Sequence, residues 1–204
     1  MRFPPQSPRT LLSLLFLLAL LAVPSFAAVP LEGDPGEGGG GGGCPLDETF
    51  FFVAQQYRDF LNREPTSWEL ADGAGPINSC LFRGDFACAD RQRVLFSRSF
   101  WDHPEFRQQS MTFGLGLVDA YPQLYDHWDF IALSYVVYLR RWFSDPPDNG
   151  SAGFDFWKAS LDNCTAPFVA AGQPQIGGST VSQCYNDIVR AFLVSTEYRA
   201  RFGC

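Results

Sequence analysis

Apolar residues beyond position 44 recur at intervals of three and four, and strict alternation of apolar with polar residues is rare. Intervals of three and four place apolar side chains on one face of a helix, whereas alternation of apolar with polar residues is typical of strands. The pattern therefore predicts an all-α protein. The expected helices run from 47 to about 62, over a short stretch after Thr66, over 89–101, from Pro104 onward, over 127–143, and over 181–202.

Local signals mark the first two helices. Asp47 is placed to cap the first one. Thr66 and Glu69 have the spacing of a capping box, in which each side chain bonds the backbone N–H of the other residue, and this predicts a short helix carrying Trp68. The segment 71–79, ADGAGPINS, contains two glycines and a proline, so it is expected to be a poor helix.

The later helices differ in strength. Pro104 suits the first turn of a helix, which Gly114 and Gly116 then weaken. The stretch 127–143, HWDFIALSYVVYLRRWF, is the most apolar and is predicted to form the centre of the core. The final helix places on one face Val181, Cys184, Tyr185, Ile188, Phe192, Ser195, Tyr198 and Phe202.

The same order of parts occurs twice, in a first repeat at about 47–107 and a second repeat at about 127–204. Each contains a Tyr-x-x-aromatic-Leu-x-Arg motif, a tryptophan, a loop bounded by cysteines, and Phe-x-x-Ser followed by acid-aromatic-Arg. Two such helical units can bury their apolar faces against each other. We therefore predict a single helical bundle built from two degenerate repeats. The paired positions are Tyr57 with Tyr135, Phe60 with Tyr138, Leu61 with Leu139, Arg63 with Arg141, Trp68 with Trp157, Phe96 with Phe192, Ser99 with Ser195, and Glu105-Phe106-Arg107 with Glu197-Tyr198-Arg199.

Three segments of these repeats carry a family resemblance: FVAQQYRDFLNREP at 52–65, YLRRWFSDPPDNGSAGFDFWKASL at 138–161 and IVRAFLVSTEYRARFG at 188–203. They resemble the bacterial family called domain of unknown function 4214, which is similar to the phycobilisome linker domains. The resemblance covers about 50–66 and 80–204. It implies a helical, extracytoplasmic, protein-binding domain with no known catalytic residues.

The N-terminus has the pattern of a secretory signal peptide, predicted to span 1–27. Arg2 and Arg9 precede an apolar run at 11–23, and small residues at Ser25 and Ala27 fit a cleavage site. The alternative is a retained anchor. A helix of that length covers about 20 Å of a hydrocarbon core near 30 Å, so a stable membrane span is not expected.

The segment that follows, 28–43, is rich in glycine and is predicted to be a disordered leader with little side-chain surface to bury. Folded structure is expected over 44–204. The expected location is secreted, periplasmic or at the cell surface.

Charge excludes one class of partner. The formal net charge of −7 becomes −9 on cleavage, because the segment removed carries two arginines and no acid. Nucleic-acid backbones and anionic membrane surfaces bind basic patches, so neither is an expected partner.

All six cysteines follow the predicted cleavage site. An even number in an exported chain indicates three disulfides, for which fifteen pairings exist. Zinc binding is disfavoured because there is no C-x-x-C motif and no histidine lies near a cysteine in the sequence. Proximity favours Cys80 with Cys88 and Cys164 with Cys184, each joining two helices, which leaves Cys44 for Cys204.

The chain offers little sign of catalysis, and we predict that it is not an enzyme. A serine or cysteine nucleophile needs a histidine base. The sequence around His103 and His127 favours a structural role for both histidines over a catalytic one. The acidic loop 145–155 lacks the bidentate acid of a calcium loop, and the glycine pair at 114–119 follows no strand. No metal or cofactor is expected.

Four aromatic residues fall off the predicted apolar stripes: Phe82, Phe86, Trp101 and Phe154. We interpret them as candidates for an exposed binding patch. The leading hypothesis is an exported adaptor domain that binds another envelope or extracellular protein. A module that binds carbohydrate or a surface polymer is the alternative, and a hydrolase is a more distant one.

Overall fold

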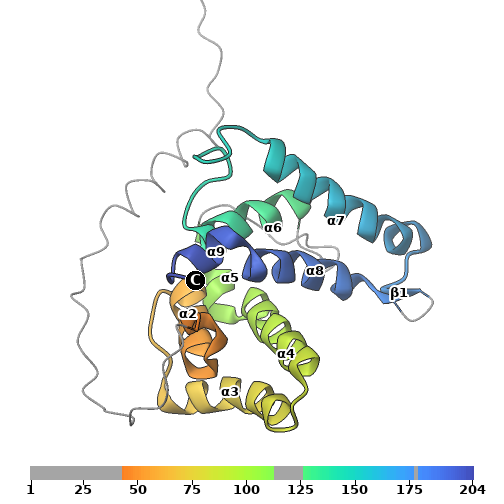
Figure 1. Ribbon diagram of the computed structural model, residues 1–204. Coiled ribbons are helices and arrows are strands. Elements are labelled where there is room, and N and C mark those ends of the chain that lie inside the picture. The colour runs from red at the N-terminus through yellow and green to blue at the C-terminus, as the bar shows by residue number, and fades with distance from the viewer. Residues whose placement is uncertain (1–42, 113–125, 177–178) are drawn as a thin grey trace, which may run out of the picture. The chain divides into compact units, whose positions relative to one another are not determined.

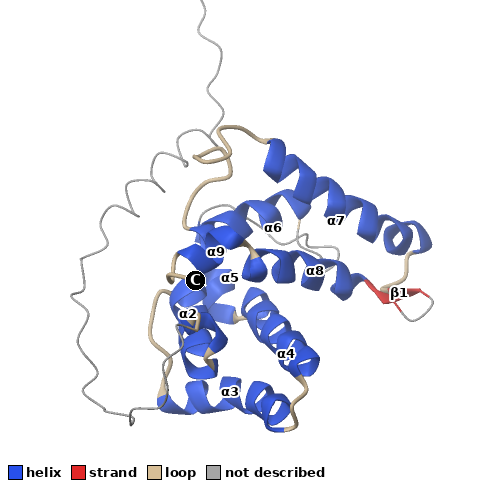
Figure 2. Ribbon diagram, in the orientation of Figure 1, coloured by secondary structure: helices blue, strands red, loops and turns tan. Residues whose placement is uncertain are grey.

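Helices form nearly all of the regular structure, which confirms the all-α class (Figure 1). The computed structural model describes residues 43–112, 126–176 and 179–204. Figure 2 shows the described strands, which pair antiparallel as one hairpin: β1 (Gln175–Ile176) and β2 (Ser179–Thr180). The predicted signal peptide, positions 28–42 of the leader, Gly114 and Gly116 lie outside the described residues.

The two repeats contain matching elements. The first consists of the 3-10 turn η1 (Pro45–Asp47), α2 (Thr49–Leu61), α3 (Ser67–Phe82), α4 (Phe86–Ser99), the 3-10 turn η2 (Phe100–Asp102) and α5 (Pro104–Thr112). The second consists of α6 (His127–Ser134), the π-helix η3 (Tyr135–Leu139), α7 (Ala152–Ala171), α8 (Val181–Val194) and α9 (Thr196–Ala200). Helices α3 and α4 pack as one hairpin, and α7 and α8 pack as another (Figure 1).

The Tyr-x-x-aromatic-Leu-x-Arg motif has a left-handed residue directly before its arginine in both repeats. In the first, Asn62 ends α2 in the left-handed conformation with a φ of 54°. In the second, Arg140 ends η3 with a φ of 56°. The following arginine then lies over the tyrosine ring of its own motif, with Arg63 5.1 Å from the centroid of Tyr57 and Arg141 5.0 Å from that of Tyr135. The sequence repeat is therefore also a structural repeat.

The stretch 127–143 forms the centre of the core, as predicted. Phe130, Ile131 and Tyr138 are fully buried. The prediction of one helix to 143 is wrong, because the chain leaves the helix at Arg140 and turns toward the loop that precedes α7.

The segment 71–79 is helical, which corrects the expectation of a poor helix. It lies inside α3, whose Ala74, Ile77 and Cys80 are buried. Gly73 allows α3 to approach α4 closely, since a Cβ at this position would lie 2.6 Å from the Phe96 ring. Packing of one apolar face therefore outweighs the low helix propensity of this segment. The Thr66–Glu69 capping box is present as predicted.

Two other expectations about helix ends need correction. Glu48, not Asp47, caps α2, and its carboxylate accepts hydrogen bonds from the backbone of Phe50 and Phe51 at 3.1 and 2.6 Å. The predicted final helix is divided at Ser195, whose hydroxyl accepts the backbone N–H of Tyr198 at 3.1 Å and so starts α9.

The repeats meet along α4 and α8 and share a buried polar network. The Ser97 hydroxyl donates to Gln56 Oε1 at 2.7 Å and lies 2.7 Å from the Tyr138 hydroxyl. Gln56 Nε2 in turn donates to the Tyr198 hydroxyl at 3.0 Å. Burial raises the pKa values of Tyr138 and Tyr198, so both phenols stay protonated as this network requires.

Asp59 anchors one end of the network with a side chain that is fully buried. It accepts hydrogen bonds from Tyr198 at 2.9 Å and from Gln55 at 2.8 Å. Arg140 and Arg201, both from the second repeat, reach the same carboxylate at 3.0 and 2.9 Å. A carboxylate of the first repeat therefore depends on cations of the second.

The cysteines form the three predicted pairs. Cys80 is bonded to Cys88 at the turn between α3 and α4, and Cys164 to Cys184 between α7 and α8. Cys44 is bonded to Cys204, with the two Cα atoms 4.8 Å apart across 160 residues of sequence. The start of the first repeat is thus joined to the end of the second, and Figure 1 shows the C-terminus beside α2.

Candidate binding surfaces

Two of the four predicted binding residues belong to the core instead. Trp101 is 0% exposed, and its ring lies 4.1 Å from that of Phe130. Phe154 is 3% exposed and stacks on Phe143 at 4.2 Å. Both sit next to turns, in η2 and the first turn of α7, where the chain folds back over the core. Their burial follows from the path of the chain at these turns, which the apolar periodicity of a helix does not predict.

Phe82 and Phe86 are exposed, at 94% and 73%. They flank the turn from α3 to α4, and we call residues 82–86 the aromatic turn. The Cys80–Cys88 disulfide closes this turn. Asp85 accepts the backbone N–H of Cys88 at 2.8 Å and caps α4. The two rings therefore project from a turn that is held on both sides.

Other exposed aromatic residues did not emerge from the sequence pattern. Trp68 is 72% exposed and Phe156 is 60% exposed. Trp68 is nine positions before the buried Ile77, which at 100° per residue places it on the opposite side of α3. The nine-residue separation can be read from the sequence, but it predicts exposure of Trp68 only if 71–79 is assigned as helix.

His127 lies in an arrangement that resembles part of a catalytic triad. Its Nδ1 is 2.5 Å from Asp162 Oδ1, and its Nε2 is 3.5 Å from the Thr165 hydroxyl. Thr165, however, is 1% exposed and donates to the carbonyl of Leu161 at 2.9 Å, so the hydroxyl is engaged inside its own helix. Burial acts to raise the pKa of Asp162, but hydrogen bonds from Lys158 and His127 hold it below its usual value. These contacts tie α6 to α7.

The acidic loop 145–155 uses its carboxylates to hold its own shape. Asp145 accepts the backbone N–H of Trp142 at 2.8 Å, and Asp155 accepts the Ser151 hydroxyl at 2.8 Å. Within residues 43–112, 126–176 and 179–204, no group of three or more His, Cys, Asp or Glu side chains is placed to hold a metal ion. In the same residues no helix has the length and apolar character needed to cross a membrane.

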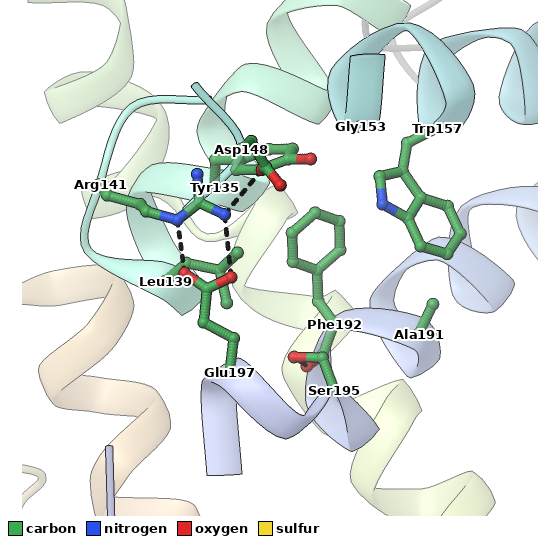
Figure 3. A pocket seen from close by; sticks show the side chains of 10 residues that line it. All are labelled: Tyr135, Leu139, Arg141, Asp148, Gly153, Trp157, Ala191, Phe192, Ser195 and Glu197. Carbon is green, nitrogen blue, oxygen red and sulfur yellow. Dashed lines mark hydrogen bonds and ion pairs between the residues drawn. The ribbon is translucent and has the colours of Figure 1, made fainter. Parts of the chain in front are cut away.

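A cavity of about 190 Å³ lies in the second repeat between α7, α8 and the Arg141 motif (Figure 3). On one side Arg141 pairs with Glu197 through both carboxylate oxygens and with Asp148 at 2.8 Å. On the other side are Trp157 and Phe192, with ring centroids 6.0 Å apart. The remaining lining residues are Tyr135, Leu139, Gly153, Ala191 and Ser195.

The first repeat contains the corresponding arginine cluster. Arg63 bonds Glu69 at 2.8 Å and Glu105 at 3.1 Å, as Arg141 bonds Asp148 and Glu197. Hydrogen bonds from Arg63 and from the backbone of Thr66 lower the pKa of Glu69 to about 2. The stabilisation from this carboxylate is therefore complete above its ordinary pKa near 4.5 and is lost as the pH falls toward 2.

The fold and these contacts define an all-α domain of two disulfide-closed helical repeats. No protein-family model, curated protein or solved structure matches the chain. Membership of the family of unknown function noted above therefore remains a prediction.

Proposed function

We propose that the protein is an exported, non-catalytic adaptor domain that binds another envelope or extracellular protein through the aromatic turn. The observation that carries this proposal is the exposure of Phe82 and Phe86, at 94% and 73%, on a turn closed by a disulfide. Large apolar side chains in water are favourable anchors for a partner when the backbone that carries them is already fixed.

Export is supported by the cysteines. The described chain has no free cysteine, and disulfides persist outside the reducing cytosol. The signal-like sequence at 1–27 supports the same conclusion. The resemblance to an extracytoplasmic protein-binding family agrees with both.

The size of the turn favours a partner with a concave apolar site over a second copy of this chain. Two phenylalanines bury roughly 300–500 Å². A stable interface needs about 800 Å² on each partner. Two copies paired through this turn alone fall short, whereas a pocketed partner can enclose both rings and add its own contacts around them.

Substitution at the aromatic turn is expected to weaken partner binding without loss of stability. A photo-crosslinking phenylalanine at position 82 identifies the neighbour in the native host, and the affinity for that neighbour is then measured. The double variant Phe82→Ser, Phe86→Ser is expected to raise Kd at least about 30-fold, since an anchor residue contributes about 2 kcal/mol or more. The melting temperature should stay within about 2 °C, because both side chains are exposed.

Phe156→Ser is the matched control, because Phe156 is also an exposed phenylalanine, at 60%, but lies in α7 of the second repeat. It is expected to leave Kd unchanged. An equal loss with Phe156→Ser, or unchanged binding by the double variant, would contradict the proposal. Crosslinking to a polysaccharide instead of a protein would favour the carbohydrate-binding alternative.

A further inference from the structure

The Tyr135 hydroxyl reaches the cavity and lacks a hydrogen-bond partner within the described chain. The residue is 3% exposed and lines the cavity beside Arg141, yet its hydroxyl makes no hydrogen bond to any described residue. Burial, with the charge of Asp148 as a further contribution, raises the pKa of this phenol to about 12. This hydroxyl is therefore available to accept a hydrogen bond from a group that enters the cavity.

Gly153 keeps the space next to this hydroxyl open. A Cβ at this position would lie 2.8 Å from the Tyr135 hydroxyl and 3.4 Å from Asp148 Oδ2. The first turn of α7 can therefore pass close to both polar groups without filling the cavity.

The cavity offers hydrogen-bond acceptors, but its cation, Arg141, has no N–H group free to donate to a ligand. All five N–H groups of Arg141 are engaged by Glu197, Asp148 and the backbone carbonyls of Trp142 and Asp145. Each carboxylate can accept further hydrogen bonds, and Asp148 Oδ1 accepts none from the described residues. With two carboxylates and one guanidinium, the cluster has a formal charge of −1.

The opposite wall is apolar and aromatic. Trp157 and Phe192 face the arginine cluster from α7 and α8, with Ala191 beside them (Figure 3). Such a wall suits an alkyl chain, and the faces of aromatic rings attract cations.

We propose that this cavity binds an alkylammonium group, which donates hydrogen bonds to Tyr135, Asp148 and Glu197 while its methylene groups pack on Trp157 and Phe192. An anion is disfavoured because Arg141 is already neutralised and outnumbered. A polyol is a poorer match because its several oxygen atoms also need donors, and the Tyr135 hydroxyl can donate one hydrogen bond whereas Arg141 has no free N–H. This site is separate from the aromatic turn and does not depend on the function proposed for it.

The test uses two-dimensional NMR of the full domain, titrated with butylammonium chloride, 1-butanol or sodium butyrate. Butylammonium is expected to give saturable shifts of the backbone amides of Gly153, Trp157 and Ala191. Butanol and butyrate should give none at the same concentration. The alkylammonium group can come from a lysine on a protein or from a free amine, and a peptide with a single internal lysine distinguishes the two. Tighter binding of the peptide than of butylammonium indicates a lysine on a protein, and weaker binding indicates a free amine.

Tyr135→Phe is expected to weaken butylammonium binding at least about tenfold, because it removes one hydrogen bond to a charged group. Tyr57→Phe is the matched control, since Tyr57 holds the same position in the first repeat but does not line this cavity. Gly153→Ala should also reduce binding by filling the space. Equal binding of butanol, no shift at these amides, or unchanged affinity in Tyr135→Phe would overturn the proposal.

Discussion

Replacing Cys44 and Cys204 together with serine is expected to lower the free energy of unfolding by about 5 kcal/mol, the largest effect of any change considered. The disulfide closes a ring of 160 residues, and the loop-entropy relation assigns a cross-link of that size a stabilisation of about 5 kcal/mol. For a domain of this length the melting temperature should fall by roughly 10–20 °C. Urea unfolding measures the free energy and thermal unfolding measures the melting temperature, both followed by circular dichroism.

The matched control is the double variant Cys80→Ser, Cys88→Ser. Its sequence separation is only 8 residues, so the same relation gives about 2.5 kcal/mol. The ring that encloses the whole domain should therefore matter about twice as much. Equal losses from the two variants would show that the end-to-end disulfide does not hold the repeats together in this way.

Asp59→Ala is expected to destabilise the domain by about 3 kcal/mol. The substitution removes the acceptor shared by Tyr198, Gln55, Arg140 and Arg201. Removing one partner of a buried charge pair costs about 3–5 kcal/mol, and the lower end applies because the Arg140 and Arg201 side chains are 38% and 23% exposed. Chemical denaturation at pH 7 measures the change.

Asp90→Ala provides the comparison for Asp59. Asp90 pairs with Arg190 between α4 and α8, but both side chains are about two-fifths exposed. An exposed pair contributes at most about 1 kcal/mol. Both pairs join the two repeats, so the difference between the variants reports the burial of Asp59 together with its larger number of hydrogen bonds. A loss from Asp90→Ala as large as that from Asp59→Ala would contradict the importance given to the buried network.

The fold class, the repeat and the two local disulfide pairs could be predicted because they depend on spacing along the chain, and the Cys44–Cys204 pair then followed by elimination. Apolar periodicity identifies a helix without knowledge of its neighbours. Cysteines that flank a short turn, as Cys80 and Cys88 do, are close in space for the same local reason. The repeated Tyr-x-x-aromatic-Leu-x-Arg motif likewise needs no partner to be recognised.

Features that depend on long-range packing were harder to predict. The helix over 71–79 forms because Gly73 lets α3 approach Phe96, a residue far along the sequence. Trp101 and Phe154 are buried because turns bring them onto the core.

The cavity next to Arg141 could be predicted only in part from the sequence. Arg141 and Glu197 belong to the repeated motifs, at positions that match Arg63 and Glu105. Opposite charges that recur together in both repeats indicate a pair, and the structure contains both pairs. The position of Gly153 against Tyr135 could not be inferred, because it depends on where α7 starts.

The proposed function depends on the claim that the mature protein is an exported bundle of two helical repeats, joined end to end by the Cys44–Cys204 disulfide. The most direct test is an intact mass, with a non-reducing peptide map, of the protein isolated from its own host. The predicted result is a chain that starts at Ala28, lacks six hydrogens relative to the reduced form, and yields one peptide pair linking Cys44 to Cys204. Thiols that react with an alkylating agent before reduction, or a chain that keeps residues 1–27, would contradict this claim.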